Sequence, residues 1–281
     1  MKSERDFSKE KNLRDRLAQD FKKETDIFWF KELDSGIDFA KQRIKNEKKT
    51  NDAIIVSDEL KNAKGRYGRA WYAPSGGIWI SYVLKINKEK IQDAPLVSHL
   101  AGLAINNTIN KYLDGCELKW VNDILYDDKK IAGILIEGIL NGEDSYLIVG
   151  IGINTNVKEF GFSFDHKTLP SYLRSKKLSE IATSVEIETG KKTDNLEMIV
   201  QMTEEFSKLH GQFNGGNEII SRYKNACRTI GKRVEVYEFG KLKMTGKAID
   251  VNEKGNLIVE TNDGRKKIIS EEVFYCDSHG N

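Results

Sequence analysis

Two short stretches hold most of the residues in this chain whose types and spacing could do chemistry. The first, Ala63 to Ser75, places Lys64, Arg66 and Arg69 on a glycine-punctuated loop that runs into Trp71. Fixed cations and free backbone N–H groups can surround a polyanion, and an indole ring can lie against an aromatic base. The loop therefore predicts a site for the phosphates of a nucleotide, although taken alone it is also typical of a solvated basic turn.

The second stretch, Lys119 to Gly138, adds an amide, a carboxylate and an amine beside short apolar runs. These groups belong to Asn122, Asp123 and Lys130, and the runs are typical of strands. The triphosphate loop GxxxxGK[ST] is absent, and Gly150-Ile151-Gly152 lacks the third glycine of a dinucleotide fingerprint. The two stretches therefore predict a nucleotide site of another kind, next to a buried pocket.

The order of these motifs resembles that of the biotin protein ligases, which activate biotin with ATP and attach it to a lysine of a carrier protein. Members of that family show a Ser-Thr-Asn box, a Gly-Arg-rich loop ending in Trp, Ser-Pro-x-Gly-Gly, Lys-Trp-Pro-Asn-Asp, Lys-x-Ala-Gly-Ile-Leu-x-Glu and Gly-x-Gly-Ile-Asn-x-Asn. The resemblance covers about residues 26 to 275, and the matching stretches are Asp34–Ile37, Ala63–Trp71, Ala73–Trp79, Lys119–Asp123, Lys130–Glu137 and Gly150–Asn156.

The resemblance implies a role for each matching residue. Lys130 and Arg66 would be catalytic, because they would stabilise charge as the biotin carboxylate attacks the α-phosphate of MgATP. The residues that would face biotin are Ser35, Gly36, Lys64, Gly65, Lys130 and Gly133. The residues that would face ATP and the adenylate are Arg66, Arg69, Trp71, Asn122, Lys130 and Asn154. Magnesium would enter with ATP, and no protein-bound metal is expected, since no Cys/His ligand spacing occurs.

The departures from the family pattern fall on the biotin side. Ser35 is kept, but Gly36 and Ile37 replace Thr and Asn, Leu60 aligns with a glutamine, and Ala63-Lys64 replaces the first Gly-Arg of the loop. The ureido group of biotin needs hydrogen-bond partners, so we expect weaker biotin binding than in relatives with the full motif. Two alternatives stay open: a ligase or acyltransferase for lipoate, octanoate or another small acid, and a non-catalytic protein that senses biotin or a nucleotide.

Composition excludes several classes of protein. The chain has 281 residues with 45 basic and 43 acidic side chains, so it has no overall positive field for nucleic acid. Its three cysteines are far apart in the sequence, which indicates reduced thiols. The charged N-terminus is unlike a signal peptide. No apolar run approaches the roughly 18 residues of a membrane span. We therefore expect a cytoplasmic protein that acts away from membranes.

The patterning predicts an α+β fold: a mixed β-sheet with helices packed on one face, followed by a small SH3-like β-barrel. We expect a charged helical extension over residues 1–25, the catalytic domain over 26–226 and the barrel over 227–281. The extension is too short for a winged helix-turn-helix, so a form of the ligase without a DNA-binding domain, and no DNA partner, is expected. The partners would be biotin, ATP and a biotin carboxyl carrier protein, and a homodimer is left open.

The hydrophobic periodicity also predicts individual elements. Strands are expected at 27–33, 53–57 and 78–85, then in succession from Leu118 to Ile153, and in the barrel at 234–237, 244–251, 257–260 and 266–269. Helices are expected at 37–46, 94–113 and within 171–225. Lys130 would then lie where a hairpin strand begins, after a turn at Asp127–Lys129.

Overall fold

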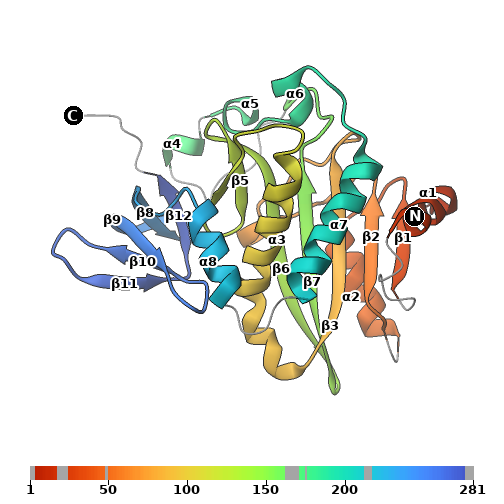
Figure 1. Ribbon diagram of the computed structural model, residues 1–281, viewed down its shortest axis with the longest axis horizontal. Coiled ribbons are helices and arrows are strands. Elements are labelled where there is room, and N and C mark those ends of the chain that lie inside the picture. Colours follow the sequence, from red (N-terminus) through yellow and green to blue (C-terminus); the bar gives the residue numbers. More distant parts are fainter. Residues whose placement is uncertain are drawn as a thin grey trace.

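The computed structural model describes residues 4–17, 25–47, 50–161, 171–174, 176–211 and 217–275. Its main element is a seven-stranded mixed sheet in the order β1-β2-β3-β7-β6-β5-β4 (Figure 1). β1 and β2 pair in parallel, and the other neighbours are antiparallel. The strands are β1 (Asp26–Phe30), β2 (Ala53–Ser57), β3 (Ile78–Ile86), β4 (Glu117–Lys119), β5 (Asp123–Tyr126), β6 (Lys129–Asn141) and β7 (Asp144–Ile153).

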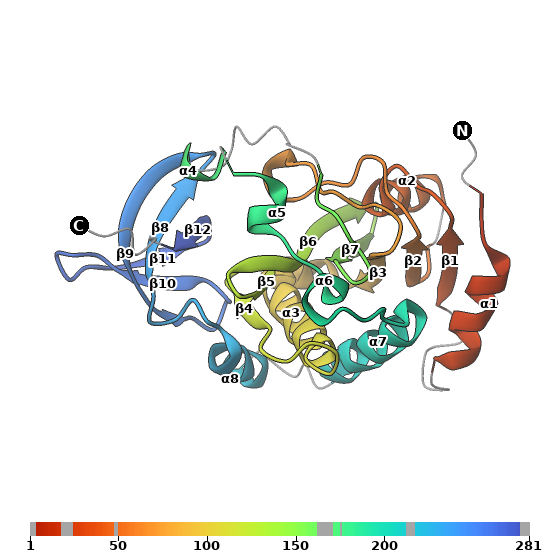
Figure 2. The same cartoon turned by 90° about the horizontal axis from the view of Figure 1, so that it is seen from above.

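Helices cover both faces of this sheet. The long helices α3 (Ala94–Ile109) and α7 (Asn195–Gly211), with α8 (Asn217–Ala226), pack on one face and enclose the larger core. The short helix α2 (Gly36–Asn46) lies on the opposite face, as Figure 2 shows. The expected mixed sheet is confirmed, and its long helices share one face. The helix predicted at 37–46 is present as α2, but it lies on the opposite face, so the helices are not all on one face as predicted.

The sequence of β2 explains why a helix is needed on each side. All five of its residues are buried, and alternate side chains point to opposite faces. Ile54 and Val56 join the core under α3 and α7, whereas Ile55 joins the core under α2. A strand that is apolar on both faces must be covered on both faces.

The C-terminal part forms a separate five-stranded antiparallel sheet in the order β11-β10-β9-β8-β12. Its strands are β8 (Arg233–Glu238), β9 (Lys241–Val251), β10 (Leu257–Glu260), β11 (Lys266–Ile269) and β12 (Glu272–Tyr275). The turns predicted at Gly240, Gly255 and Gly264 are present, and each of these glycines has a positive φ. Strand β12 was not among the strands predicted from the sequence.

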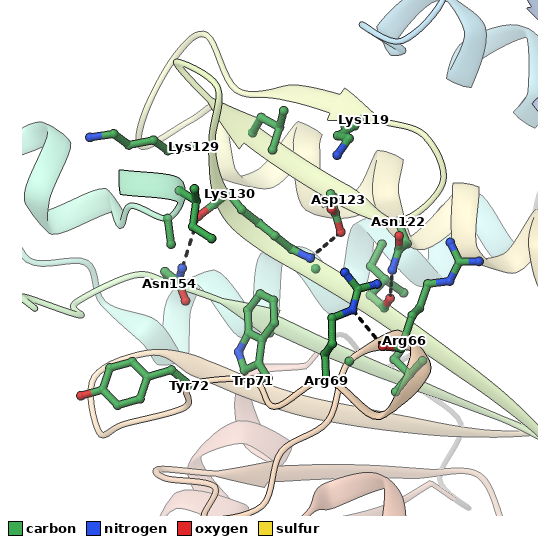
Figure 3. A pocket seen from close by; sticks show the side chains of 18 of the residues that line it. Arg66, Arg69, Trp71, Tyr72, Lys119, Asn122, Asp123, Lys129, Lys130 and Asn154 are labelled. Carbon is green, nitrogen blue, oxygen red and sulfur yellow. Dashed lines mark hydrogen bonds and ion pairs between the residues drawn. The ribbon is translucent and has the colours of Figure 1, made fainter. Parts of the chain in front are cut away.

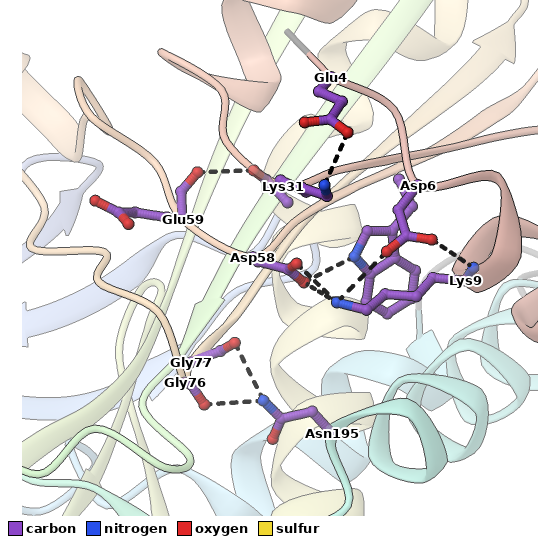
Figure 4. Close-up of polar contacts among 11 residues, drawn as sticks. Glu4, Asp6, Lys9, Lys31, Asp58, Glu59, Gly76, Gly77 and Asn195 are labelled. Atoms are coloured by element: carbon purple, nitrogen blue, oxygen red, sulfur yellow. Dashed lines mark hydrogen bonds and ion pairs between the residues drawn. The ribbon is translucent and has the colours of Figure 1, made fainter.

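The N-terminal segment is packed on the edge of the main sheet. Arg5 forms an antiparallel bridge with Phe30, and α1 (Phe7–Arg16) buries Leu13 completely. Asp58, at the end of β2, accepts hydrogen bonds from the Trp29 indole at 2.8 Å and the Lys9 ammonium at 2.7 Å (Figure 4). The predicted N-terminal helix is therefore confirmed over α1, while residues 18–24 lie outside the described residues.

The remaining helices are short. They are α4 (Ser171–Arg174), α5 (Leu178–Ile181), α6 (Val185–Thr189) and the 3₁₀ turns η1 (Arg66–Gly68) and η2 (Lys88–Asp93). Among the described residues, no helix combines the length and the apolar character needed to cross a bilayer.

Candidate active site

A cavity of about 690 Å³ lies on the face of the main sheet that carries α2. Two rows of paired residues form its floor. Trp79, Gly152, Gly133 and Asp123 are partners across β3, β7, β6 and β5, and Ser81, Gly150 and Leu135 form the next row. All eleven residues that the sequence assigned to a site line this one cavity: Ser35, Gly36, Lys64, Gly65, Arg66, Arg69, Trp71, Asn122, Lys130, Gly133 and Asn154.

Glycines in the floor let other residues lie directly on the sheet. An ideal Cβ at Gly152 would lie 2.9 Å from the Trp71 indole, and one at Gly133 would lie 3.0 Å from the same ring. Nζ of Lys130 would be 3.1 Å from a Cβ at Gly133. The space above Gly133 is therefore occupied by Trp71 and Lys130, whereas the resemblance implies that Gly133 faces biotin.

Trp71 forms one wall of the cavity. Its indole N–H is buried and has no hydrogen-bond partner among the described residues. The Lys130 ammonium lies 5.0 Å from the centre of its ring, within the range of a cation–π contact. The ring thus holds the Lys130 ammonium from one side.

A cluster of charges occupies one end of the cavity (Figure 3). Nζ of Lys130 lies 2.6 Å from Oδ1 of Asp123. Burial alone would raise the pKa of the Asp123 carboxyl, but the charges of Lys130 and Lys119 outweigh it and hold that pKa below its usual value. Burial lowers the pKa of Lys119, which stacks over the rings of Phe274 and Tyr275. Positive charge is therefore in excess here, as a polyphosphate site requires.

The glycine-punctuated loop is a tight hairpin beside this cluster. The Gly65 amide donates to the Arg69 carbonyl at 2.7 Å, and the Trp71 amide donates to the Ala63 carbonyl at 2.9 Å. Gly68 and the residue before it, Tyr67, have φ values of 71° and 58°, so the turn needs a glycine to keep its left-handed strain low. The hairpin fixes the spacing between its arginines and Trp71.

The hairpin also contacts the C-terminal sheet. The Arg69 guanidinium forms an ion pair with the Glu272 carboxylate, and Arg66 donates to the carbonyl of Ser270 at 3.4 Å. The rings of Tyr67 and Phe239 meet edge to face at 5.3 Å between centroids. The site is therefore built from both sheets, and Glu272 could not be found from the loop motif because it lies in another part of the chain.

The two asparagines brace the backbone around the cavity. Asn122 donates to the Ile134 carbonyl at 2.6 Å, and Asn154 donates to the Thr183 carbonyl at 2.9 Å. Oδ1 of Asn154 is buried and has no hydrogen-bond partner among the described residues. The side-chain amides thus hold the loops that follow β4 and β7.

The turn before β3 is fixed by residues from distant elements. Asn195 donates to the carbonyls of Gly76 and Gly77 at 2.8 and 3.2 Å (Figure 4). The Thr155 hydroxyl also donates to the Gly76 carbonyl, at 2.8 Å. An ideal Cβ at Gly76 would lie 2.5 Å from the Asn156 carbonyl oxygen, so a side chain cannot be accommodated there. These contacts join the Gly-Gly turn to the Gly-x-Gly-Ile-Asn-x-Asn stretch.

At the other end the cavity is apolar. Ile37 is 8% exposed and Trp79 2% exposed, and Leu60 and Leu135 complete the wall. Ser35 begins α2, where its hydroxyl accepts the Asp38 amide at 3.2 Å. The cavity therefore combines a cationic end and an apolar end, which suits a nucleotide next to an apolar acid.

Two family models match the chain. The Biotin/lipoate A/B protein ligase family matches residues 29–154, and the Biotin protein ligase C terminal domain matches residues 229–275. The chain belongs to the biotin protein ligase family.

Members of the family are similar over most of the chain. It is 29% identical over 243 residues to the bifunctional ligase/repressor BirA of Bacillus subtilis, a match that covers 83% of this chain and 70% of that protein. It is 26% identical to the biotin–[acetyl-CoA-carboxylase] ligase of Paracoccus denitrificans, over 80% of this chain and 91% of the relative. The biotin protein ligase from Aquifex aeolicus in complex with biotin and ATP has the same fold, with a TM-score of 0.70, 27% identity and coverage of 89% and 97% of the two chains.

Proposed function

We propose that the chain is an ATP-dependent biotin protein ligase. It forms biotinyl-5′-AMP from biotin and MgATP and then transfers biotin to a lysine of a biotin carboxyl carrier protein. The observation that carries the proposal is one cavity that joins an apolar end to a cationic end and is lined by all eleven predicted site residues. Family membership and the similarity to a ligase solved with biotin and ATP support it.

The first step joins the acid to AMP. A carboxylate oxygen of biotin attacks the α-phosphorus of ATP, the bond from that phosphorus to the bridging oxygen breaks, and pyrophosphate leaves with the electron pair. In the proposal the Lys130 ammonium, held by Asp123, stabilises the charge that gathers between carboxylate and phosphate. Arg66 and Arg69 bind phosphate oxygens, since guanidinium groups match their geometry.

The second step transfers the acyl group. The amine of the carrier lysine attacks the acyl carbon, the bond to AMP breaks, and the amine loses a proton. The work of the protein in both steps is positioning and electrostatic stabilisation, so no covalent protein nucleophile is required. Trp71, Asn122 and Asn154 are proposed to hold the adenylate, and Ser35, Gly36, Lys64, Gly65 and Gly133 the acid.

Several finer points belong to the same proposal. Magnesium is proposed to enter with ATP. Residues 1–25, 26–226 and 227–281 are proposed to be the extension, the catalytic domain and the C-terminal domain, and the protein is proposed to act in the cytoplasm without DNA. The balance of 45 basic and 43 acidic residues supports the last point, and a homodimer is left open.

The test is a single incubation of the protein with labelled biotin, ATP and a carrier domain. We expect pyrophosphate release and label on one lysine of the carrier. No pyrophosphate release with any acid would overturn the enzyme assignment and favour a sensing protein.

A second candidate substrate follows from the apolar wall. Leu60 and Ile37 stand where the family pattern has polar residues, so lipoate or octanoate would also find apolar contacts there. A parallel assay with each acid separates the cases: pyrophosphate release with lipoate or octanoate but not with biotin would keep the reaction and change the substrate.

A further inference from the structure

The hairpin that carries Lys130 has an unfavourable turn. Strands β5 and β6 pair Tyr126 with Lys129, so only two residues, Asp127 and Asp128, join them. Both have a left-handed backbone, with φ values of 45° and 63°. A two-residue turn in which both φ values are positive favours asparagine followed by glycine, because a Cβ crowds the backbone there. The Asp-Asp pair is therefore a poor sequence for the turn that the structure contains.

The conformation of this turn decides where the Lys130 side chain points. Lys130 is the second residue after the turn, and its ammonium faces Asp123 across the hairpin at 2.6 Å (Figure 3). A slip of one residue in the pairing would move the side chains of the strand to the other face of the sheet. The register already shifts between Ile124 and Leu125, so a bulge lies directly beyond Lys130. The ladder alone therefore does not fix the register, and the turn has to contribute.

Arg228 holds the turn from outside the hairpin. Its Nη2 lies 2.8 Å from Oδ1 of Asp128, and its Nη1 lies 3.1 Å from Oε2 of Glu117 in β4. The Arg228 side chain is 20% exposed, and its guanidinium lies 5.8 Å from the centre of the Tyr275 ring, within the range of a cation–π contact. One arginine thus connects β4 and β12 to the turn between β5 and β6.

The backbone around Arg228 is fixed to β4. Cys227 forms a parallel bridge with Leu118, and the Arg228 amide donates to the Leu118 carbonyl at 2.9 Å. The Thr229 hydroxyl accepts the Trp120 amide at 2.9 Å. The segment between α8 and the C-terminal sheet therefore pairs with β4 like one more short strand, and it presents the arginine from a rigid support.

We propose that Arg228 is a positioning residue for adenylate formation, an inference that rests on the proposed function. By pairing with Asp128 it keeps the turn left-handed and fixes the register of β6. The fixed register holds the Lys130 ammonium at Asp123. Asp128 is the more exposed partner, so the ion pair contributes little to global stability, but it biases the local choice between two registers. Arg228 acts through the turn and does not need to touch the substrate, although it lines the cavity.

The test asks whether a better turn replaces the arginine. The rate constant of adenylate formation is measured in single turnovers, as pyrophosphate release, at varied biotin and varied ATP. We expect Arg228→Ala to lower this rate constant roughly fivefold, the upper range for a partly exposed ion pair, with both half-saturating concentrations within about twofold of wild type. Asn-Gly forms the turn without a clamp, so adding Asp127→Asn and Asp128→Gly should restore the rate constant to within about twofold of wild type.

Glu117→Ala is the matched control. It removes the other carboxylate that pairs with Arg228 and leaves the turn intact, so we expect an unchanged rate constant. Hydrogen exchange of residues 123–133 should be faster in Arg228→Ala and should return to the wild-type rate with the Asn-Gly turn. If Arg228→Ala lowers Tm more than the control does, Arg228→Gln, which keeps most of the length without the charge, takes its place with the same expectation.

A direct contact between Arg228 and a phosphate would give a different pattern. The half-saturating concentration of ATP would rise in Arg228→Ala, and the Asn-Gly turn would not restore the rate constant. That pattern, or an unchanged rate constant in Arg228→Ala, would overturn the inference while leaving the ligase assignment intact. Failure of the wild-type protein to release pyrophosphate with any acid would instead overturn the proposed function itself.

Discussion

The charge pair of Lys130 and Asp123 organises the cationic end of the cavity. A lysine at the start of a strand would ordinarily point to solvent, and the neighbouring Lys129 points away from Asp123 in Figure 3. Here the carboxylate at 2.6 Å and the ring of Trp71 hold Lys130 over the sheet. Because a preorganised cation needs no reorganisation during the reaction, it stabilises developing charge efficiently.

Lys130→Ala should therefore reduce adenylate formation to less than about a tenth of wild type, a loss of at least roughly 1.4 kcal/mol of transition-state stabilisation. The measurement is pyrophosphate release from biotin and ATP, with circular dichroism to confirm folding. Lys129→Ala is the matched control, since it removes an adjacent lysine directed away from Asp123, and it should keep nearly full activity. Comparable activity in both variants would remove Lys130 from the chemistry.

At the scale of single residues, the sequence predicted the site residues that lie in motifs. It missed those that reach the site only because the folded chain brings them there. All eleven predicted site residues line one cavity. Glu272 was missed because its relevance depends on a contact with the distant residue Arg69. Lys119 was quoted within its motif, but only the packed structure places it beside Asp123.

The glycine-punctuated loop is the element most directly coupled to the chemistry. It is held on one side by its own hairpin hydrogen bonds and on the other by the ion pair between Arg69 and Glu272. Arg66 makes only long hydrogen bonds among the described residues, to the Ser270 carbonyl and the Tyr67 hydroxyl, both at 3.4 Å, so its guanidinium can turn to a phosphate. The loop thus presents one arginine tied to the C-terminal sheet and one available for the intermediate.

Arg66→Ala should release the acyl-adenylate prematurely while leaving the fold intact. The loss of one guanidinium–phosphate contact is worth about 1.5–3 kcal/mol in a partly closed site. We expect free biotinyl-AMP in solution and label on amines other than the carrier lysine, measured by chromatography and mass spectrometry. Arg265→Ala, which removes an exposed arginine of the C-terminal sheet, should retain the intermediate as wild type does. Identical release rates in the two variants would show that the loop does not hold the phosphate.

The sequence predicted the ends of an element where the hydrophobic periodicity was long. It did not predict them where a single side chain ends the element. The helix predicted over 94–113 stops at Ile109. Oδ1 of Asn110 accepts the amides of Gly115 and Cys116 at 2.9 and 3.0 Å and so turns the chain. Likewise, α2 was predicted correctly as a helix, but its face of the sheet follows from Gly150, where a Cβ would lie 2.6 Å from Ile37.

At the scale of the whole molecule, the N-terminal segment belongs to the main sheet. Glu10 is 9% exposed. Its carboxylate accepts a hydrogen bond from the Trp29 amide at 3.0 Å and forms an ion pair with Arg5 at 2.6 Å. α1 is a single helix that buries Glu10 and Leu13 at the sheet edge, and one helix does not make a helix-turn-helix. The balanced charge gives no compensating attraction.

We therefore expect this chain to show only weak, salt-sensitive binding to DNA, without sequence preference. The measurement is a gel-shift series with promoter fragments at about 50 and 200 mM salt, with and without biotin and ATP. A salt-resistant, sequence-specific complex would contradict the expectation.

The two sheets are joined through His99. This histidine of α3 is fully buried, donates from Nε2 to the Gly255 carbonyl of the C-terminal sheet at 2.8 Å, and stacks on the Tyr223 ring of α8 at 3.9 Å. Trp120 donates to the same carbonyl at 3.0 Å. Burial lowers the pKa of His99 to about 4. The junction is therefore stable only while the imidazole is neutral.

The pH dependence of folding should report this junction. Between pH 4 and 6.5 the unfolded chain protonates His99 and the folded chain does not, so stability falls as pH falls through that window, by roughly 2 kcal/mol between pH 6.5 and 5. The depressed pKa of Asp123 acts in a different window, because its stabilisation is lost only below the unfolded carboxyl pKa of about 3.9.

His99→Gln keeps a donor for Gly255 but cannot titrate. Denaturant unfolding at pH 5, 6 and 7 should therefore give a flatter profile for the variant, even if its stability at pH 7 is lower because the ring stacking is lost. Parallel profiles would mean that His99 is solvated or charged in the folded protein, and that the junction between the sheets does not depend on a neutral imidazole.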